Sequence, residues 1–311
     1  MGTFYTIKFE SDLNRDSIKY KVDSLLNSFE NELSTYRPKS TISQFNTSQK
    51  GISVDTLSQF YKAFSKAKKL YKETNGYFDP TISPLVNYYG FGYDKQMKKE
   101  AINSDTISSL INLVGMQKLR EKRENGMAFI FKFHPDQQLD LSASAKGGGV
   151  DFVAEYLKSS NISNFMVEIG GEVYATGKNE KGLSWTIGIS NPSPGSSPSD
   201  ILIPLQISSS GLASSGNYRN FYQSDSLTFA HIINAKTGLS QPTDILSTTV
   251  LAEDCETADA FATAFMAMGL EKSIDLTHKL KHIKTCFIYF DERGDSLAFK
   301  FSNGFEQNLI R

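Results

Sequence analysis

The segment from Leu139 to Asp151, Leu-Asp-Leu-Ser-Ala-Ser-Ala-Lys-Gly-Gly-Gly-Val-Asp, constrains the fold more than any other stretch of the chain. It places a strand-end carboxylate, a lysine and three consecutive glycines at the start of a predicted helix. Glycines let a backbone approach a ligand closely, and the free N–H groups at a helix N-terminus favour anions. The segment therefore predicts either a site for a phosphate-bearing ligand or a tight strand-to-helix turn without one. It lacks the residue order of a P-loop and of a Rossmann fingerprint.

Composition indicates an ordinary globular protein. Of the 311 residues, 39% are hydrophobic and 22% are charged, which is enough apolar material for a substantial core. We expect one compact domain over residues 1–311. Lys plus Arg number 33 and Asp plus Glu 34, so the net charge of −1 argues against nucleic acid as a partner. Cys255 and Cys286 form no CxxC pair and indicate buried apolar residues, not a zinc site or a disulfide framework.

The hydrophobic pattern predicts an α+β fold with a mixed sheet. A helical period of 3.6 residues appears over residues 16–33, 55–71, 105–114 and 257–269, and again after residue 149. Strands are predicted at residues 3–9, 129–133, 165–175, 185–189, 201–207, 248–252, 286–290 and 297–301. Pro80 and Pro84 predict an ordered loop, not a regular helix, around Asp79. Residues 191–199 predict a long surface loop.

One pair of side chains and one histidine could supply catalytic chemistry on their own evidence. Asp259 and Thr263 lie four residues apart on a predicted helix, so one hard cation such as magnesium could contact both; a capping or core-edge pair is the alternative. His231 opens a polar turn and could be a general base or a phosphate ligand, although a structural role also fits.

Three further residues leave two interpretations open. Glu168 lies in an apolar strand before two glycines, where it either binds a ligand or is a buried, hydrogen-bonded acid. Arg219 and Arg37 each lie beside aromatic residues, which suits stacking or phosphate pairing but equally a plain surface position.

Eight sequence blocks, in order, resemble the motifs of the ApbE family, the FAD:protein FMN transferases. The resemblance runs from Met1 to about Gly269 and rests on these blocks: Met-Gly-Thr-Phe-Tyr-Thr-Ile, Leu-Ser-Thr-Tyr-Arg-Pro with Ser-Gln-Phe-Asn behind it, Gly-Tyr-Phe-Asp-Pro-Thr, Asp-Leu-Ser-Ala-Ser-Ala-Lys-Gly, Val-Glu-Ile-Gly-Gly-Glu, Ser-Gly-Asn-Tyr-Arg-Asn, His-Ile-Ile-Asn-Ala-Lys-Thr-Gly and Ala-Asp-Ala-Phe-Ala-Thr-Ala.

The resemblance implies a magnesium-dependent transferase of tunnelling-fold type. Such an enzyme splits the FAD pyrophosphate, releases AMP and joins FMN through a phosphoester to a Ser or Thr of an acceptor flavoprotein, within a Ser/Thr-Gly-Ala-Thr-like motif. It further implies that His231 is the base toward the acceptor hydroxyl, with Asp259 also catalytic. The metal is expected on Ala143, Asp259, Ala262 and Thr263. Contacts to FAD are expected from Met1, Tyr36, Tyr77, Phe78, Asp79, Asp140, Lys146 and Ile233, with Glu168 and Arg219 as further candidates.

Two other functions remain possible for the same residues. They could serve an FAD pyrophosphatase that gives FMN and AMP, or a flavin-binding protein without catalysis. The aromatic Tyr36 favours transfer over hydrolysis.

Three residues depart from the family motifs. Gly148 replaces the family's usual aromatic residue, Ser144 replaces a common branched apolar residue, and Asn234 replaces a frequent aspartate. Family members are typically exported lipoproteins, so we expect a periplasmic or cell-surface location, membrane-associated through a lipid anchor absent from this chain.

Overall fold

The computed structural model describes residues 2–93, 103–193, 195–197, 199–216, 221–224, 227–230, 232–240, 243–291 and 296–310, with the backbone alone for 221–224 and 227–230. The chain forms two compact units, each built from separate stretches of sequence. Unit 1 comprises Met1–Leu26, Lys146–Phe221 and Pro242–Arg311, and unit 2 comprises Asn27–Ala145 and Tyr222–Gln241. The expected α+β class is confirmed, while the single domain expected over residues 1–311 stays a prediction.

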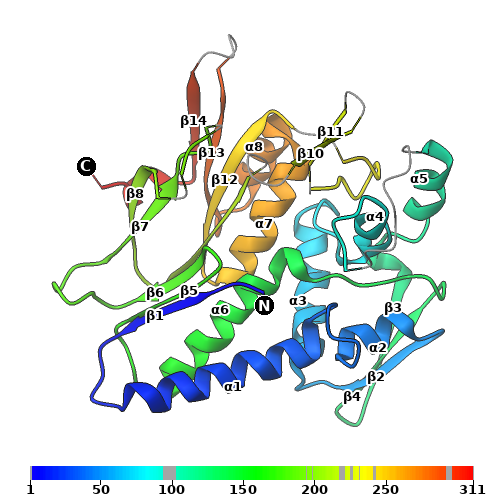
Figure 1. Ribbon diagram of the computed structural model, residues 1–311, viewed down its shortest axis with the longest axis horizontal. Coiled ribbons are helices and arrows are strands. Elements are labelled where there is room, and N and C mark those ends of the chain that lie inside the picture. Colours follow the sequence, from blue (N-terminus) through cyan, green and yellow to red (C-terminus); the bar gives the residue numbers. More distant parts are fainter. Residues whose placement is uncertain are drawn as a thin grey trace. The chain divides into compact units, whose positions relative to one another are not determined.

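Unit 1 is built on a seven-stranded antiparallel sheet (Figure 1). In spatial order its strands are β1 (Tyr5–Phe9), β5 (Phe165–Ile169), β6 (Glu172–Thr176), β9 (Ser210–Gly216), β12 (Ile245–Ala252), β13 (Lys284–Phe290) and β14 (Leu297–Ser302). Alternation along β5 sends Phe165, Val167 and Ile169 into one apolar cluster and Met166 into another. Both faces of the sheet are therefore buried.

Helices cover one face and a hairpin the other. The long helices are α1 (Arg15–Leu33), α6 (Ser142–Ser159) and α7 (Cys255–Met268), and α8 (Leu270–Lys279) follows α7. Ile18 and Val22 of α1 pack with Val150 and Val153 of α6 against the first face. The other face is covered by β7 (Trp185–Ser190), β8 (Ile201–Ile207) and the short helix η3 (Phe305–Asn308). Cys255 and Cys286 are buried free thiols, as expected.

Unit 2 combines helices with a three-stranded antiparallel sheet. The sheet order is β2 (Gly51–Asp55), β4 (Met127–Lys132) and β3 (Leu119–Glu124). The helical elements are α2 (Thr41–Thr47), α3 (Gln59–Glu73), η1 (Pro80–Ile82), α4 (Ser83–Tyr88), α5 (Ser104–Ile111) and η2 (Met116–Lys118). The strands β10 (Phe221–Ser224) and β11 (Leu227–Ala230) pair with each other. Within the described residues, no helix is both long and apolar enough to cross a membrane.

Three sequence expectations about local structure are wrong. Pro80 and Pro84 do not exclude helices, because each occupies one of the first two positions of a short helix, where proline's missing N–H costs nothing. The predicted strand over 165–175 is a hairpin, since Gly170 and Gly171 both adopt positive φ (59° and 102°) and turn the chain between β5 and β6. The predicted helix over 55–71 begins only at Gln59, after the strand β2.

Candidate active site

The glycine run of the opening segment lies inside a helix. Helix α6 begins at Ser142, so Gly147, Gly148 and Gly149 occupy its second turn and form neither a bend nor a phosphate-binding loop. A Cβ on Gly147 would lie 2.6 Å from the Cys255 carbonyl carbon and 2.7 Å from the Glu256 Cα. Gly147 thus allows α6 to approach the start of α7 closely. Asp140 is likewise not at a strand end, because β4 ends at Lys132.

The first turn of α7 is fixed from two sides in unit 1. The Asp151 carboxylate on α6 accepts hydrogen bonds from the backbone N–H groups of Cys255 and Glu256, both at 2.8 Å. A Cβ on Gly211 of β9 would lie 2.5 Å from the Cys255 Cα, so this strand also passes close to the helix start. Burial raises the pKa of the Cys255 thiol well above its ordinary value, which keeps it protonated and unreactive.

One turn further along α7, Asp259 lies in a buried cluster of charged groups. Its side chain is 5% exposed, and its Oδ2 accepts the Gly147 N–H at 3.0 Å. Burial raises the pKa of Asp259, and the Glu172 carboxylate raises it further, whereas Lys146 and the Gly147 N–H oppose the rise. The carboxylate is therefore costly to ionise unless a cation joins it.

Glu172 and Lys146 complete this cluster. The Lys146 ammonium on α6 donates a hydrogen bond to Glu172 Oε1 at the start of β6. Burial lowers the pKa of Lys146, but the carboxylates of Asp259 and Glu172 outweigh this effect and raise it. Glu172 Oε2 is buried and finds no hydrogen-bond partner in the part of the chain that the structure describes. Two carboxylates thus interact with one ammonium, so these three groups carry a net charge of −1 when both acids are ionised.

Glu172 was not among the predicted site residues, although its motif was. The predicted residue of that motif, Glu168, is half-buried in β5 opposite Thr6 and Val173. The Gly170–Gly171 turn places Glu172 next to Lys146, and a Cβ on Gly170 would lie 3.4 Å from Lys146 Cδ. The sequence contained a signal for Glu172, because two glycines in a row predict a hairpin turn and Glu172 follows them directly.

Unit 2 contains several of the residues predicted to contact FAD, and they differ in solvent exposure. They include Tyr77, Phe78, Asp79, Asp140 and Ile233. Asp79 is buried, which raises its pKa to about 6, and its Oδ1 accepts hydrogen bonds from the Thr81 N–H and hydroxyl. The Tyr77 ring lies under Lys236 Nζ, 4.5 Å from the ring centroid. Phe78 and Ile233 are 2% and 5% exposed, so their side chains belong to the core.

Tyr36 has the opposite environment. Its side chain is 67% exposed and meets Tyr93 edge-on, with 6.5 Å between the ring centroids. Arg37 pairs with Glu30 and donates hydrogen bonds to Asn27 and Asn31, so it has a structural role in unit 2.

The predicted metal ligands fall on two helices. Asp259, Ala262 and Thr263 lie on α7 and Ala143 on the first turn of α6. Thr263 is half-buried and stands one turn beyond Asp259. Among the described residues, no group of three or more His, Cys, Asp and Glu side chains could hold a metal. A metal here therefore depends on carbonyl and hydroxyl oxygens beside Asp259. Met1, Arg219 and His231 lie outside the described residues.

Comparison with known proteins identifies the class and then the family. The solved structure of the flavin transferase ApbE from Vibrio cholerae shares this fold: it superposes with a TM-score of 0.88 at 31% identity, covering 99% of this chain and 96% of its own. Relatives named FAD:protein FMN transferase are 34% identical in Haemophilus influenzae, over 90% of this chain and 82% of theirs, and 36% identical in Vibrio cholerae, over 88% and 81%. The ApbE family model matches residues 1–287, and the chain belongs to the ApbE family.

Proposed function

We propose that this protein is an FAD:protein FMN transferase. It would transfer the FMN portion of FAD to a Ser or Thr hydroxyl of an acceptor flavoprotein. The acceptor oxygen forms a bond to the FMN phosphorus, the pyrophosphate P–O bond breaks, and AMP leaves. The carrying observation is family membership, because relatives with this name match over most of their length.

The buried cluster in unit 1 supports a divalent cation as cofactor. Asp259 is an oxygen ligand of the kind magnesium prefers, and the cluster contains one carboxylate more than its single ammonium balances. When bound, magnesium would neutralise charge on the pyrophosphate oxygens. The Gly147 N–H donates to Asp259 Oδ2, which orients this carboxylate. The family resemblance adds the Ala143 and Ala262 carbonyls and the Thr263 hydroxyl as proposed ligands.

The remaining roles follow the chemistry of each group. Lys146 is part-exposed and cationic, so it would pair with a phosphate oxygen while Glu172 holds its ammonium. His231 would accept the proton of the acceptor hydroxyl, a role that the family resemblance assigns. Because phosphoryl transfer consists mostly of positioning and charge neutralisation, no covalent enzyme intermediate is needed. The periplasmic or cell-surface location stays a prediction.

One experiment separates the proposal from both alternatives. The protein is incubated with FAD and magnesium, with and without a flavoprotein carrying a Ser/Thr-Gly-Ala-Thr-like motif. AMP is measured by chromatography and the acceptor by intact-mass spectrometry. If the protein is a transferase, AMP appears and the mass of the acceptor increases by that of FMN minus one water. AMP with free FMN and an unmodified acceptor would indicate a pyrophosphatase. FAD binding without AMP would indicate a non-catalytic flavin-binding protein.

A further inference from the structure

Asn46, at the end of α2, clamps the backbone of a residue far away in the sequence. Its Nδ2 donates to the Leu139 carbonyl at 2.9 Å, and its Oδ1 accepts the Leu139 N–H at 2.7 Å. Both residues are buried, Leu139 completely. One side-chain amide therefore satisfies both backbone groups of a single residue, as a neighbouring strand would. Buried backbone groups lack water as a substitute partner, so this clamp fixes the position of Leu139.

The clamped residue directly precedes Asp140. The Asp140 N–H donates to the Pro80 carbonyl at 2.7 Å, and Asp140 Oδ1 accepts the Ser142 N–H at 2.8 Å at the start of α6. Pro80 in turn follows Asp79. The two acidic residues predicted to contact FAD thus share one hydrogen-bonded backbone frame, and Asn46 holds one end of that frame.

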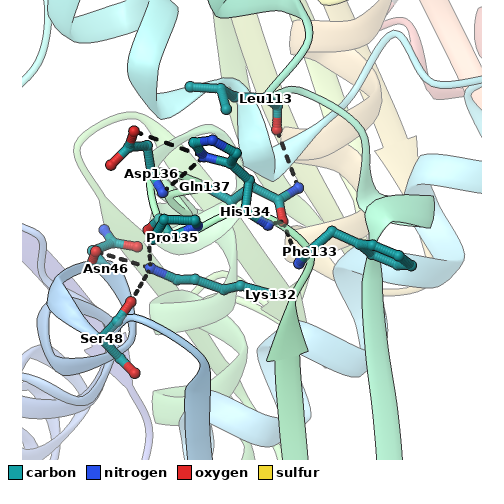
Figure 2. A network of polar contacts seen from close by, with 9 residues as sticks. All are labelled: Asn46, Ser48, Leu113, Lys132, Phe133, His134, Pro135, Asp136 and Gln137. Atoms are coloured by element: carbon teal, nitrogen blue, oxygen red, sulfur yellow. Dashed lines mark hydrogen bonds and ion pairs between the residues drawn. The ribbon is translucent and has the colours of Figure 1, made fainter.

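Lys132 holds the backbone of Asn46 itself (Figure 2). Lys132 Nζ donates to the backbone carbonyls of Asn46 and Ser48, both at 2.9 Å, and of Pro135 at 3.1 Å. These three bonds use every proton of the ammonium. They join the end of α2 to the turn after β4, so Asn46 has little freedom to move away from Leu139.

The opposite end of this turn is also held. Gln137 Oε1 accepts the N–H groups of Phe133 and His134 at 2.8 and 3.0 Å, and its Nε2 donates to the Leu113 carbonyl at 3.3 Å (Figure 2). The segment that leads to Asp140 is therefore fixed along its length by buried amides. Such fixation is typical of residues that orient a ligand-binding group.

We propose that Asn46 is a positioning residue for FAD binding and acts through Asp140. This inference rests on the proposed function. An ionised carboxylate only accepts hydrogen bonds, so Asp140 would recognise a hydroxyl or ring N–H of the flavin nucleotide, not its phosphates. Such recognition depends on direction, because hydrogen bonds weaken steeply away from linear geometry. The clamp supplies this direction by fixing the backbone beside the carboxylate.

A double-mutant cycle tests this coupling. FAD dissociation constants are measured by flavin fluorescence, and KM and kcat by AMP release, for the wild type, Asn46→Ala, Asp140→Ala and the double variant. We expect Asn46→Ala to raise both the dissociation constant and KM for FAD by about tenfold, with kcat changed by less than about threefold. In the Asp140→Ala background the same substitution should change FAD affinity by less than about twofold.

The control is Asn303, whose side-chain amide also bonds backbone groups. Asn303 Nδ2 donates to the carbonyls of Thr277, Leu280 and Ile283 in unit 1. Its φ is 53°, so Asn303→Gly removes these bonds without backbone strain. This variant should lower the melting temperature and leave FAD affinity unchanged. If Asn46→Ala does not fold, Asn46→Asp keeps the acceptor for the Leu139 N–H and replaces the donor with a carboxylate oxygen, which cannot bond the Leu139 carbonyl.

The outcomes are distinct. Additive effects of the two substitutions, or an Asn46 variant that binds FAD like the wild type, would overturn the positioning role. A wild-type protein that binds FAD but releases no AMP would overturn the proposed transfer reaction, while the binding cycle would still decide the role of Asn46. A wild-type protein that binds no FAD would overturn both.

Discussion

The backbone N–H of Gly147 donates a hydrogen bond to the Asp259 carboxylate, 3.0 Å from Oδ2. This bond joins the second turn of α6 to the second turn of α7 and is possible because Gly147 has no side chain. The residue that allows the two helices to approach is therefore also the residue that orients the acid. Packing and chemistry depend on the same position.

Gly147→Ala should destabilise the protein although alanine is the better helix former. The intrinsic preference favours alanine by about 1 kcal/mol, but the added Cβ would lie 2.6 Å from the Cys255 carbonyl carbon. We expect a net loss of about 2–4 kcal/mol in the free energy of unfolding, because backbone must move. Urea denaturation measures this loss. Glu155→Ala, at an exposed position of the same helix, should change stability by less than about 0.5 kcal/mol; equal effects would show that the helices are not tightly packed here.

Asp259→Asn should stabilise the metal-free protein at neutral pH while abolishing activity. Burial raises the pKa of Asp259 in the folded state above its unfolded value near 4. The folded state then binds more protons, so wild-type stability falls as pH rises above about 4 toward the folded pKa. Asparagine removes this fall and keeps an oxygen for the Gly147 N–H. With EDTA present, unfolding free energies at pH 5 to 8 should differ by on the order of 2 kcal/mol at the upper end.

Magnesium provides the internal control for this variant. Adding it should raise the melting temperature of the wild type and leave that of Asp259→Asn unchanged. Equal stabilisation of both proteins would mean that the cation binds elsewhere.

Asp151→Asn should act in the opposite direction. The Asp151 carboxylate accepts two N–H groups at the start of α7, at 2.8 Å each, and carries a negative charge at a helix N-terminus. An asparagine offers one oxygen, so one buried N–H loses its partner. We expect a loss of about 1–3 kcal/mol at pH 7 by chemical denaturation. Glu155→Gln, which removes a charge from the exposed face of α6, should have little effect; a comparable loss there would assign the change to charge alone.

Tyr36→Asn should increase hydrolysis of FAD to free FMN at the expense of FMN transfer to the acceptor. The Tyr36 ring is 67% exposed and supported by Tyr93, so it can cover a ligand without rearranging the core. We expect a lower ratio of flavinylated acceptor to free FMN, measured in one reaction by mass spectrometry and chromatography, with total AMP changed by less than about threefold. Tyr20→Asn, at an exposed tyrosine on α1, is the matched substitution. An unchanged ratio in Tyr36→Asn would remove this residue from the control of transfer.

Elements with a clear hydrophobic period could be predicted from the sequence. The strand β8 has the expected bounds, Ile201–Ile207, and α1 begins one residue before the expected start. Alternation and helical spacing are local signals that survive folding. The spacing of Asp259 and Thr263 likewise predicted that both lie on one helix, which α7 confirms, while their role as metal ligands stays a prediction.

The errors came from residues whose role depends on tertiary contacts. Three glycines indicate a turn when read locally, but Gly147 is required because Cys255 lies against it from 108 positions further along the chain. Glu172 appeared to be one of two similar acids, and only the hairpin turn shows which of them faces Lys146. The clamp between Asn46 and Leu139 spans 93 residues and has no periodic signal.

The tight fit around Cys255 has a consequence for how substitutions combine. Gly147 belongs to α6, Gly211 to β9, and each leaves space for the same turn of α7. A side chain added at either position would displace that turn, and a displaced turn would meet less resistance from the second added side chain. The losses of unfolding free energy caused by alanine at Gly147 and at Gly211 should therefore not add up in the double variant.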